Sequence, residues 1–342
     1  MHLVPGPENF VVEEIPAYEA CGEGEHLHVI MRKRDCTTAR LVAALATACQ
    51  VPQRDIGYAG RKDRHGITTQ ALTIRGGDAT RLDHLSQYLP PGASAEIIAV
   101  SRHRNKLRIG HLRGNHFHLR IAGIDQPQHL QAQLDQLHTH GILNHYGPQR
   151  YGRDGRNLSR ALGVVNGEIP LPRNRQQRQY LADAAQAAVF DHIVQQRHNQ
   201  GLTTQAMVGD VIMLDNGACF IARDEDLEQV NRRLLAGSCS CTGPLPGAAC
   251  MPAEGAAKDH EENWCQQAHF PWRSFQDKAP FHSRGDRRRI TERFLVTPQL
   301  TTPDHPEAPY TLSFALGPGA YATSVLSQLG IRADERSQPH AT

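Results

Sequence analysis

GYAGRKDRHGITTQ, at residues 57–70, carries the densest group of chemically useful side chains in the chain. Its single carboxylate, Asp63, is surrounded by Arg61, Lys62 and Arg64, and the glycines around it permit a tight turn. Three neighbouring cations favour the ionised form of Asp63, and an ionised aspartate on a rigid turn can act as a nucleophile or a base. The competing interpretation is an ordinary charged turn exposed to solvent.

The sequence on both sides of this turn predicts one mixed unit of strands and helices over residues 1–146. Apolar residues at helical spacing after Thr38, a plausible N-cap, predict a helix that Pro52 closes. Alternating or continuous apolar runs predict strands at 10–14, 27–31, 68–75, 97–100 and 117–121. Helical spacing also predicts helices over 82–89 and 127–140.

The composition changes after residue 146, and this change predicts a second unit. A helix is expected over about 176–198 and a strand over 208–214, whereas residues 237–285, rich in Gly, Pro and Ala, are expected to be irregular. Regular structure is expected to return near Arg293, with a strand over 310–316 and a helix over 321–329.

A second concentration of charge lies at 101–120, where twenty residues include six basic side chains, four histidines and no acid. Phosphate is the natural partner of such a stripe, because the arginine fork matches phosphate oxygens. Asn115 and Phe117 lie within it, and an amide and a ring beside cations can hydrogen-bond and stack a nucleobase. A strand face neutralised by distant acids, with Phe117 in the core, is the alternative.

Two further basic stretches, at 147–160 and 284–293, extend the possible contacts to phosphate, although the second also fits an ordinary charged helix end. We expect the following arginines to contact an RNA backbone: Arg61, Arg64, Arg104, Arg108, Arg113, Arg153, Arg287 and Arg288.

Global composition excludes several classes of protein. The 342 residues carry a net charge of +2, and of 37 basic residues only five are lysines, an excess of arginine that genome base composition would also explain. No apolar run approaches the roughly 20 residues that span a bilayer, and no signal-peptide pattern opens the chain, so a soluble cytoplasmic protein is expected. The eight scattered cysteines fit reduced thiols. The glycine loop at 317–322 comes too late for a dinucleotide site, and Cys239, Cys241, Cys250 and Cys265 lack the spacing of a zinc site.

The stretch at 57–70 resembles the signature of the TruD family of tRNA pseudouridine synthases, in which a glycine-rich turn and a basic residue precede an aspartate. Other segments resemble the family in the same order along the chain: PENFVVEEIP at 7–16, NKLRIG at 105–110, GNHF at 114–117, NHYGPQRYG at 144–152 and GAYATSVLSQL at 319–329.

The resemblance implies an α+β fold, with a pseudouridine-synthase-type catalytic domain (1–146 and 295–342) whose mixed, largely antiparallel sheet is interrupted by an inserted TRUD domain (147–294). It implies isomerisation of a uridine in tRNA, uridine 13, with Asp63 as the catalytic nucleophile or base. The substrate-binding residues expected with it are Phe10, Lys62, Gln70, Asn115, Phe117 and Arg150. No cofactor, metal, membrane or obligatory protein partner is expected, and the chain is expected to act on tRNA as a monomer.

Two functions of other classes remain open at this stage. One is a structured-RNA-binding protein that performs no chemistry. The other is a metal-dependent hydrolase, which is disfavoured because the 20 histidines show no H-E-x-x-H spacing.

Overall fold

The structure is a computed structural model that describes residues 1–268, 281, 283–303, 305 and 307–333. The described chain forms two compact units. Unit 1 consists of Met1–Asp135, Phe294–Ala322 and the segment that starts at Leu329, and unit 2 consists of Gln136–Arg293 and Thr323–Gln328. The chain passes between the units at 135/136 and 293/294, where the sequence predicts 146/147 and 294/295, and Thr323–Gln328 also belongs to unit 2.

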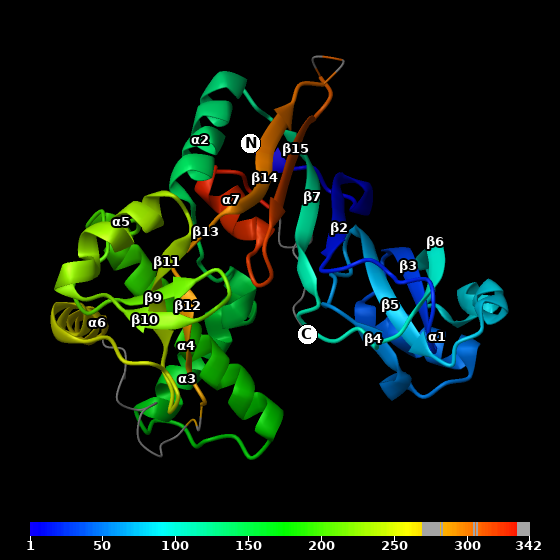
Figure 1. Cartoon of the computed structure of the whole chain (residues 1–342), viewed down its shortest axis with the longest axis horizontal. Coiled ribbons are helices and arrows are strands. Elements are labelled where there is room, and N and C mark those ends of the chain that lie inside the picture. The colour runs from blue at the N-terminus through cyan, green and yellow to red at the C-terminus, as the bar shows by residue number, and fades with distance from the viewer. Residues whose placement is uncertain (269–280, 282, 304, 306, 334–342) are drawn as a thin grey trace. The chain divides into compact units, whose positions relative to one another are not determined.

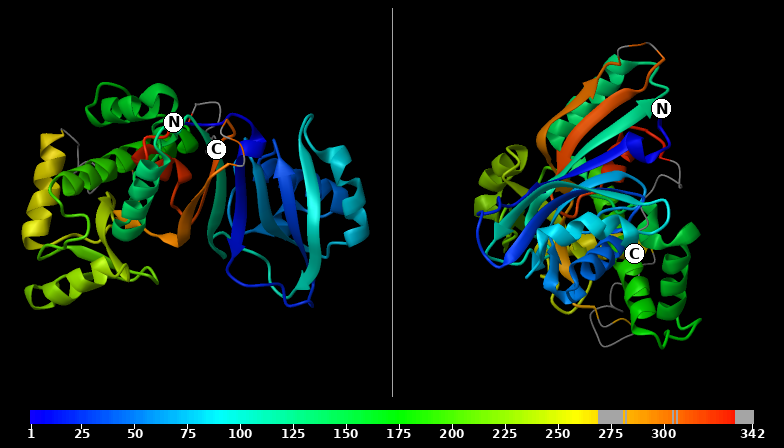
Figure 2. Two further views of the ribbon diagram at one scale, coloured as in Figure 1. Left: turned by 90° about the horizontal axis from the view of Figure 1, so that it is seen from above. Right: turned by 90° about the vertical axis from the view of Figure 1, so that its right-hand side faces the viewer.

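Unit 1 is built on a nine-stranded sheet whose main path runs β14-β15-β7-β2-β5-β3-β6 (Figures 1 and 2). The pair β2 and β5 is parallel, the other neighbours are antiparallel, and β1 and β4 join β7 and β5 at the side. Its strands are β1 (His2–Leu3), β2 (Phe10–Pro16), β3 (His26–Arg34), β4 (Ile56–Tyr58), β5 (Ile67–Arg75), β6 (Ser94–His103), β7 (Leu112–Ala122), β14 (Phe294–Thr301) and β15 (Tyr310–Leu316). This mixed sheet with its helices is the α+β fold expected from the sequence.

Helix α1 (Thr38–Cys49) covers one face of β3 and β5 in unit 1. The Thr37 hydroxyl caps it by accepting a hydrogen bond from the Arg40 amide, and the helix ends where Gln50 adopts a left-handed conformation. Leu41 and Leu45 are fully buried against the strands, together with the 3-10 helix η3 (Ala79–Tyr88). The sequence placed the N-cap one residue late, at Thr38, and expected an ordinary helix where η3 lies.

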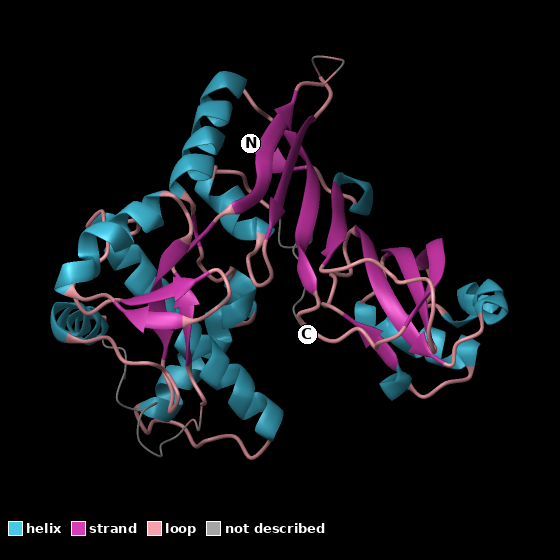
Figure 3. Cartoon of the chain, viewed as in Figure 1, coloured by secondary structure: helices cyan, strands magenta, loops and turns pink. Residues whose placement is uncertain are grey.

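In unit 2, helices (cyan in Figure 3) surround a four-stranded sheet. The order of that sheet is β10-β9-β11-β12, and β8 and β13 form a separate antiparallel pair. The strands of unit 2 are β8 (Ile142–Leu143), β9 (Val211–Leu214), β10 (Cys219–Ile221), β11 (Cys239–Leu245), β12 (Asp286–Arg289) and β13 (Thr291–Glu292). The helices that remain are α2 (Pro127–His140), which contains the boundary between the units, α3 (Arg156–Val165), α4 (Arg175–Asn199), α5 (Leu227–Leu235), α6 (Gly255–Gln267) and α7 (Ala322–Gln328). The long helix α4 lies at the centre of this unit, and its Phe190 is fully buried.

The expectation of irregular structure over 237–285 is wrong for much of that segment. Strand β11 pairs with both β9 and β12, and helix α6 buries Trp264 and Cys265 against α4. Glycine is required in β11 at Gly243, which lies against the Phe190 ring, because a Cβ there would lie 2.9 Å from a ring carbon. The part of this expectation at 269–280 and 282 lies outside the described residues. Among the helices that are described, none has the length and apolar character needed to cross a membrane.

Candidate active site

The loop between β4 and β5 holds Asp63, and close backbone packing fixes that loop. A Cβ on Gly57 would lie 2.3 Å from the Leu107 carbonyl oxygen, and one on Gly66 would lie 2.6 Å from the Phe10 carbonyl oxygen. Both distances are shorter than any real contact, so these two positions require glycine. The glycines of the sequence motif therefore place the loop against β2 and against the segment that precedes β7.

A buried lysine anchors the loop at Asp63 itself. Lys33, on β3, is 1% exposed, and its ammonium group donates hydrogen bonds to the carbonyl oxygens of Asp63 (2.7 Å) and Cys36 (2.5 Å). Burial lowers the pKa of Lys33 to about 8, against the opposing effect of nearby groups that include the Asp63 carboxylate. Lys33 thus holds the backbone of Asp63 through its carbonyl oxygen, and the Lys33 ammonium charge also acts on the Asp63 carboxylate.

The carboxyl group of Asp63 is harder to ionise than the sequence alone indicated. Burial raises its pKa to about 6, and the nearby Lys33 and Lys62 ammonium groups only partly offset this. The expectation that flanking cations would set its charge took no account of desolvation, and Arg61 and Arg64 are both exposed. Asp63 is therefore mostly ionised at pH 7, about one pH unit above its pKa. A carboxylate whose pKa lies this close to the working pH serves well as a base.

Lys62 points away from solvent and joins three elements. It is 7% exposed, and its ammonium group lies 2.7 Å from a carboxylate oxygen of Glu14 on β2 and donates a 2.6 Å hydrogen bond to Asn115 on β7. The other carboxylate oxygen of Glu14 accepts from the Ala71 amide of β5 at 3.2 Å. Two predicted site residues, Lys62 and Asn115, thus meet directly, and Glu14 completes their contact.

Gln70 and Thr38 form a second connection to the loop. The Thr38 hydroxyl accepts a hydrogen bond from the Lys62 amide at 2.8 Å and lies 2.9 Å from the Gln70 side-chain oxygen, to which it donates. Gln70 is 1% exposed, and its amide nitrogen has no hydrogen-bond partner among the described residues. Gln70 therefore supports the loop from the interior.

Phe10 and Phe117 lie at the edge of an aromatic cluster in unit 1. Their rings meet edge to face with centroids 6.4 Å apart, and Phe117 also stacks on Phe314 at 5.3 Å. The two rings are only 5% and 8% exposed. The Phe117 ring therefore lies in the core, as the alternative interpretation expected.

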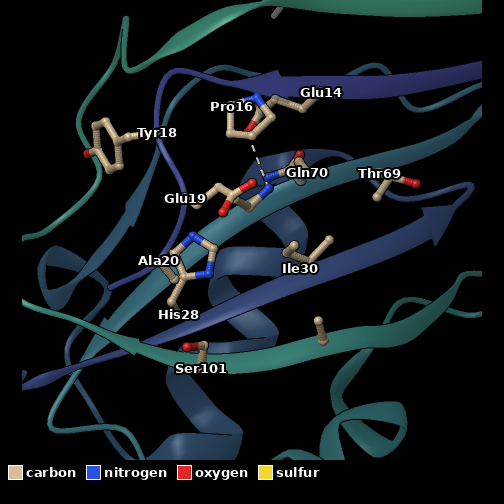
Figure 4. A pocket seen from close by; sticks show the side chains of 12 residues that line it. Glu14, Pro16, Tyr18, Glu19, Ala20, His28, Ile30, Thr69, Gln70 and Ser101 are labelled. Carbon is tan, nitrogen blue, oxygen red and sulfur yellow. Dashed lines mark hydrogen bonds between the residues drawn. The ribbon is translucent and has the colours of Figure 1, made fainter. Parts of the chain in front are cut away.

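Unit 1 contains a pocket of about 410 Å³ (Figure 4). Glu14 and Gln70 line it from one side, and His28 and Ser101 line it from the neighbouring strands β3 and β6. Neither Asp63 nor Phe117 is among its lining residues. Glu14 is the residue that links the pocket to the Lys62 contact.

Comparison with known proteins identifies the family. The family model described as "tRNA pseudouridine synthase D (TruD)" matches residues 1–169 and 170–329. The chain belongs to the TruD family. Proteins named tRNA pseudouridine synthase D from Aeromonas hydrophila subsp. hydrophila and Aeromonas salmonicida are each 35% identical to it, over 94% of this chain and 88% of theirs. A crystal structure titled as a putative tRNA pseudouridine synthase D from Methanosarcina mazei shares the fold, with a TM-score of 0.76, 23% identity, and coverage of 96% and 93% of the two chains.

Membership of the TruD family confirms the resemblance seen in the sequence and makes the chain an isomerase that converts uridine to pseudouridine in tRNA.

The arginines expected to contact RNA fall into two groups. Those of unit 1 are all exposed: Arg61, Arg64, Arg104, Arg108 and Arg113. Arg104 is paired with Glu23, an exposed contact that RNA phosphate can replace at small cost.

The arginines of unit 2 are largely engaged within the protein. Arg287 is 4% exposed and held by Glu261 at 2.6 Å and by the Met251 carbonyl oxygen, so its expected role at an RNA backbone is corrected to that of a buried ion pair.

Arg288 donates a hydrogen bond to Asn144 and lies over the Tyr146 ring, with its guanidinium carbon 4.4 Å from the ring centroid. Arg150 lies 3.5 Å from Asp183 and over the same ring, and the side chain of Arg153 lies outside the described part of the chain.

Sequence reasoning did not single out Glu14 or Lys33. Both continue the buried face of a strand: Glu14 follows Phe10 and Val12 at alternate positions of β2, and Lys33 follows Met31 on β3. A charged residue that follows apolar residues on the buried face of a strand is the sequence signal that could have identified both.

Proposed function

We propose that the chain converts uridine 13 of tRNA into pseudouridine and that Asp63 is the nucleophile or general base of this reaction. The observation that carries the proposal is the half-buried carboxyl group of Asp63 on a loop held by Lys33, beside the Lys62 contact to Glu14 and Asn115. The choice of uridine 13 as the target in tRNA rests on the family resemblance alone. Unit 1, which contains all of these residues, is proposed as the catalytic domain and unit 2 as the inserted domain.

The reaction is an isomerisation, so the tRNA neither gains nor loses atoms overall. The bond between uracil N1 and the ribose C1′ breaks, the base turns, and a bond forms from C5 to C1′. The proton on C5 then leaves and N1 gains one. A carboxylate can attack the sugar or the base, or can remove a proton, and each of these routes requires Asp63 to be ionised.

The target base has to leave its stack before this chemistry can occur. Phe117 and Phe10 are proposed to contact the extruded uracil, which requires a local rearrangement because both rings are buried, and Asn115, oriented by Lys62, is proposed to hydrogen-bond it. The exposed arginines of unit 1 are proposed to hold phosphates of the distorted strand. Arg150 of unit 2 is proposed to contact the tRNA substrate, for which its partner Asp183 would have to release it.

A direct test uses tRNA transcripts labelled with tritium at C5 of uridine. Formation of the C5–C1′ bond releases that tritium to water, and we expect one equivalent to be released per modified tRNA. A chain that binds the transcript without releasing tritium would be an RNA-binding protein, and the proposed reaction would be refuted.

The pH dependence follows from the raised pKa of Asp63. Because the group has to be ionised and its pKa is about 6, kcat/KM should fall about tenfold per pH unit below 6 and level off above about 7. Single-turnover tritium release between pH 5 and 8 measures this profile. A profile that stays flat down to pH 5 would show that Asp63 keeps an ordinary carboxyl pKa or takes no part in the rate.

Phe117→Leu tests the contact with the base. Leucine preserves most of the packing against Phe314 but removes the aromatic edge, and base–aromatic stacking contributes about 1–3 kcal/mol. We expect kcat/KM to fall roughly tenfold or more. Phe294→Leu, which alters the same aromatic cluster where Phe294 meets Phe314, is the matched control and should keep wild-type kinetics. Equal kinetics in both variants would show that Phe117 is only a core residue.

A further inference from the structure

Strands β2 and β7 place Glu13, His116 and His118 together on one face of the sheet of unit 1. Glu13 is directly opposite His116 in the antiparallel register, and His118 is two residues further along the same strand, opposite Val11. Because side chains alternate along a strand, the two histidines share a face and Asn115 and Phe117 share the other. One potential ligand atom from each of Glu13, His116 and His118 lies within 4.8 Å of the others.

The local contacts orient these groups as metal ligands are usually oriented. Nδ1 of His118 is 3.0 Å from the Ser313 hydroxyl on β15, while its Nε2 faces a carboxylate oxygen of Glu13 at 3.8 Å. Ligating histidines generally use one ring nitrogen for the metal and the other for a hydrogen bond, which fixes the ring. The His116 ring lies beside that of His118, with centroids 4.3 Å apart.

We propose that Glu13, His116 and His118 bind one divalent transition-metal ion of the zinc class, with water completing its coordination. Two imidazoles and a carboxylate are a common ligand set for zinc. Tetrahedral bonds of about 2.1 Å separate ligand atoms by about 3.4 Å, so small side-chain rotations suffice to close the site. All three residues are half-buried, which leaves room for water at the remaining positions.

The position of the cluster in the sheet indicates what a bound ion would do there. The bound ion would join β2 to β7 on the face opposite Asn115 and Phe117. Its role is therefore to stiffen the two strands that carry the proposed substrate residues, and the proposal does not depend on Asp63 chemistry.

The test is a calorimetric titration of the full chain with Zn²⁺ after treatment with a chelator. The variants are Glu13→Gln, His116→Asn and His118→Asn, with His129→Asn, an exposed histidine of α2, as the matched control. We expect wild type and His129→Asn to bind one ion that each of the three variants binds at least tenfold more weakly. Saturating Zn²⁺ should raise the unfolding temperature of wild type by about 5 °C and that of the three variants by much less.

Ser313→Ala adds a readout that an incidental surface site would not show, since loss of the hydrogen bond to His118 should weaken Zn²⁺ binding about tenfold. The eight cysteines could also bind zinc, and the three variants separate that contribution because they leave every thiol in place.

The proposal is overturned if wild type binds no Zn²⁺, or if all variants bind it as wild type does. Unfolding temperatures without metal identify any variant that fails to fold, and the remaining variants then decide.

Discussion

Asp63→Asn should lower the single-turnover rate of pseudouridine formation by at least about 10³-fold while tRNA binds with unchanged affinity. Asparagine keeps the shape of the side chain and the carbonyl oxygen that Lys33 holds, but it can neither attack as a nucleophile nor accept a proton as a carboxylate does. Tritium release under single-turnover conditions, together with an equilibrium binding measurement, tests both halves of this expectation.

The same variant should be at least as stable as wild type at pH 7. The pKa of Asp63 is raised in the folded chain, so ionisation costs stability as pH rises through about 6, and asparagine removes that cost. A loss of activity accompanied by unfolding would point to a structural role for Asp63. Normal turnover by Asp63→Asn would remove it from the proposed mechanism.

Lys62→Met should have the largest effect on stability, lowering the free energy of unfolding by about 3–5 kcal/mol. The side chains of Lys62 and Glu14 are only 4% and 3% exposed, so removal of the ammonium group leaves a buried carboxylate without its charged partner. Urea unfolding measures the loss. The double variant Lys62→Met with Glu14→Gln should recover much of it, because no unpaired buried charge remains.

Arg104→Met is the matched control for this prediction. It breaks an ion pair with Glu23 in which both side chains are more than 60% exposed, and such pairs contribute about 1 kcal/mol or less. If Lys62→Met cost no more than Arg104→Met, the Lys62 contact would not hold β2, the loop and β7 together.

Lys62, Asp63, Asn115 and Phe117 could be singled out from the sequence because they come from one continuous motif and from one strand, whereas Glu14 and Lys33 come from two other strands. The glycines of 57–70 indicated a tight turn, and the structure shows the close contacts at Gly57 and Gly66 that require them. The pairing of Lys62 with Asn115 was not predictable from spacing, since 53 positions separate the two residues and only the sheet register brings them together.

The charges were predicted less well than the positions. Sequence proximity placed Arg61 and Arg64 beside Asp63, yet the cations that act on its carboxyl group are Lys33, from another strand, and Lys62. Arg287 was expected on the surface because it lies in a run of basic residues, but β12 turns its side chain toward Glu261 in the interior. Burial is a property of the folded chain, and a run of charges does not reveal which member of the run is buried.

This TruD-family chain isomerises uridine to pseudouridine in tRNA, and we propose that it acts on uridine 13 through Asp63. Carbodiimide treatment followed by primer extension, on an unmodified tRNA transcript incubated with wild type or Asp63→Asn, maps every pseudouridine that forms. We expect a single new stop, at uridine 13, with wild type and none with Asp63→Asn. A stop of equal strength with both proteins, or no stop with wild type, would refute the proposed role of Asp63.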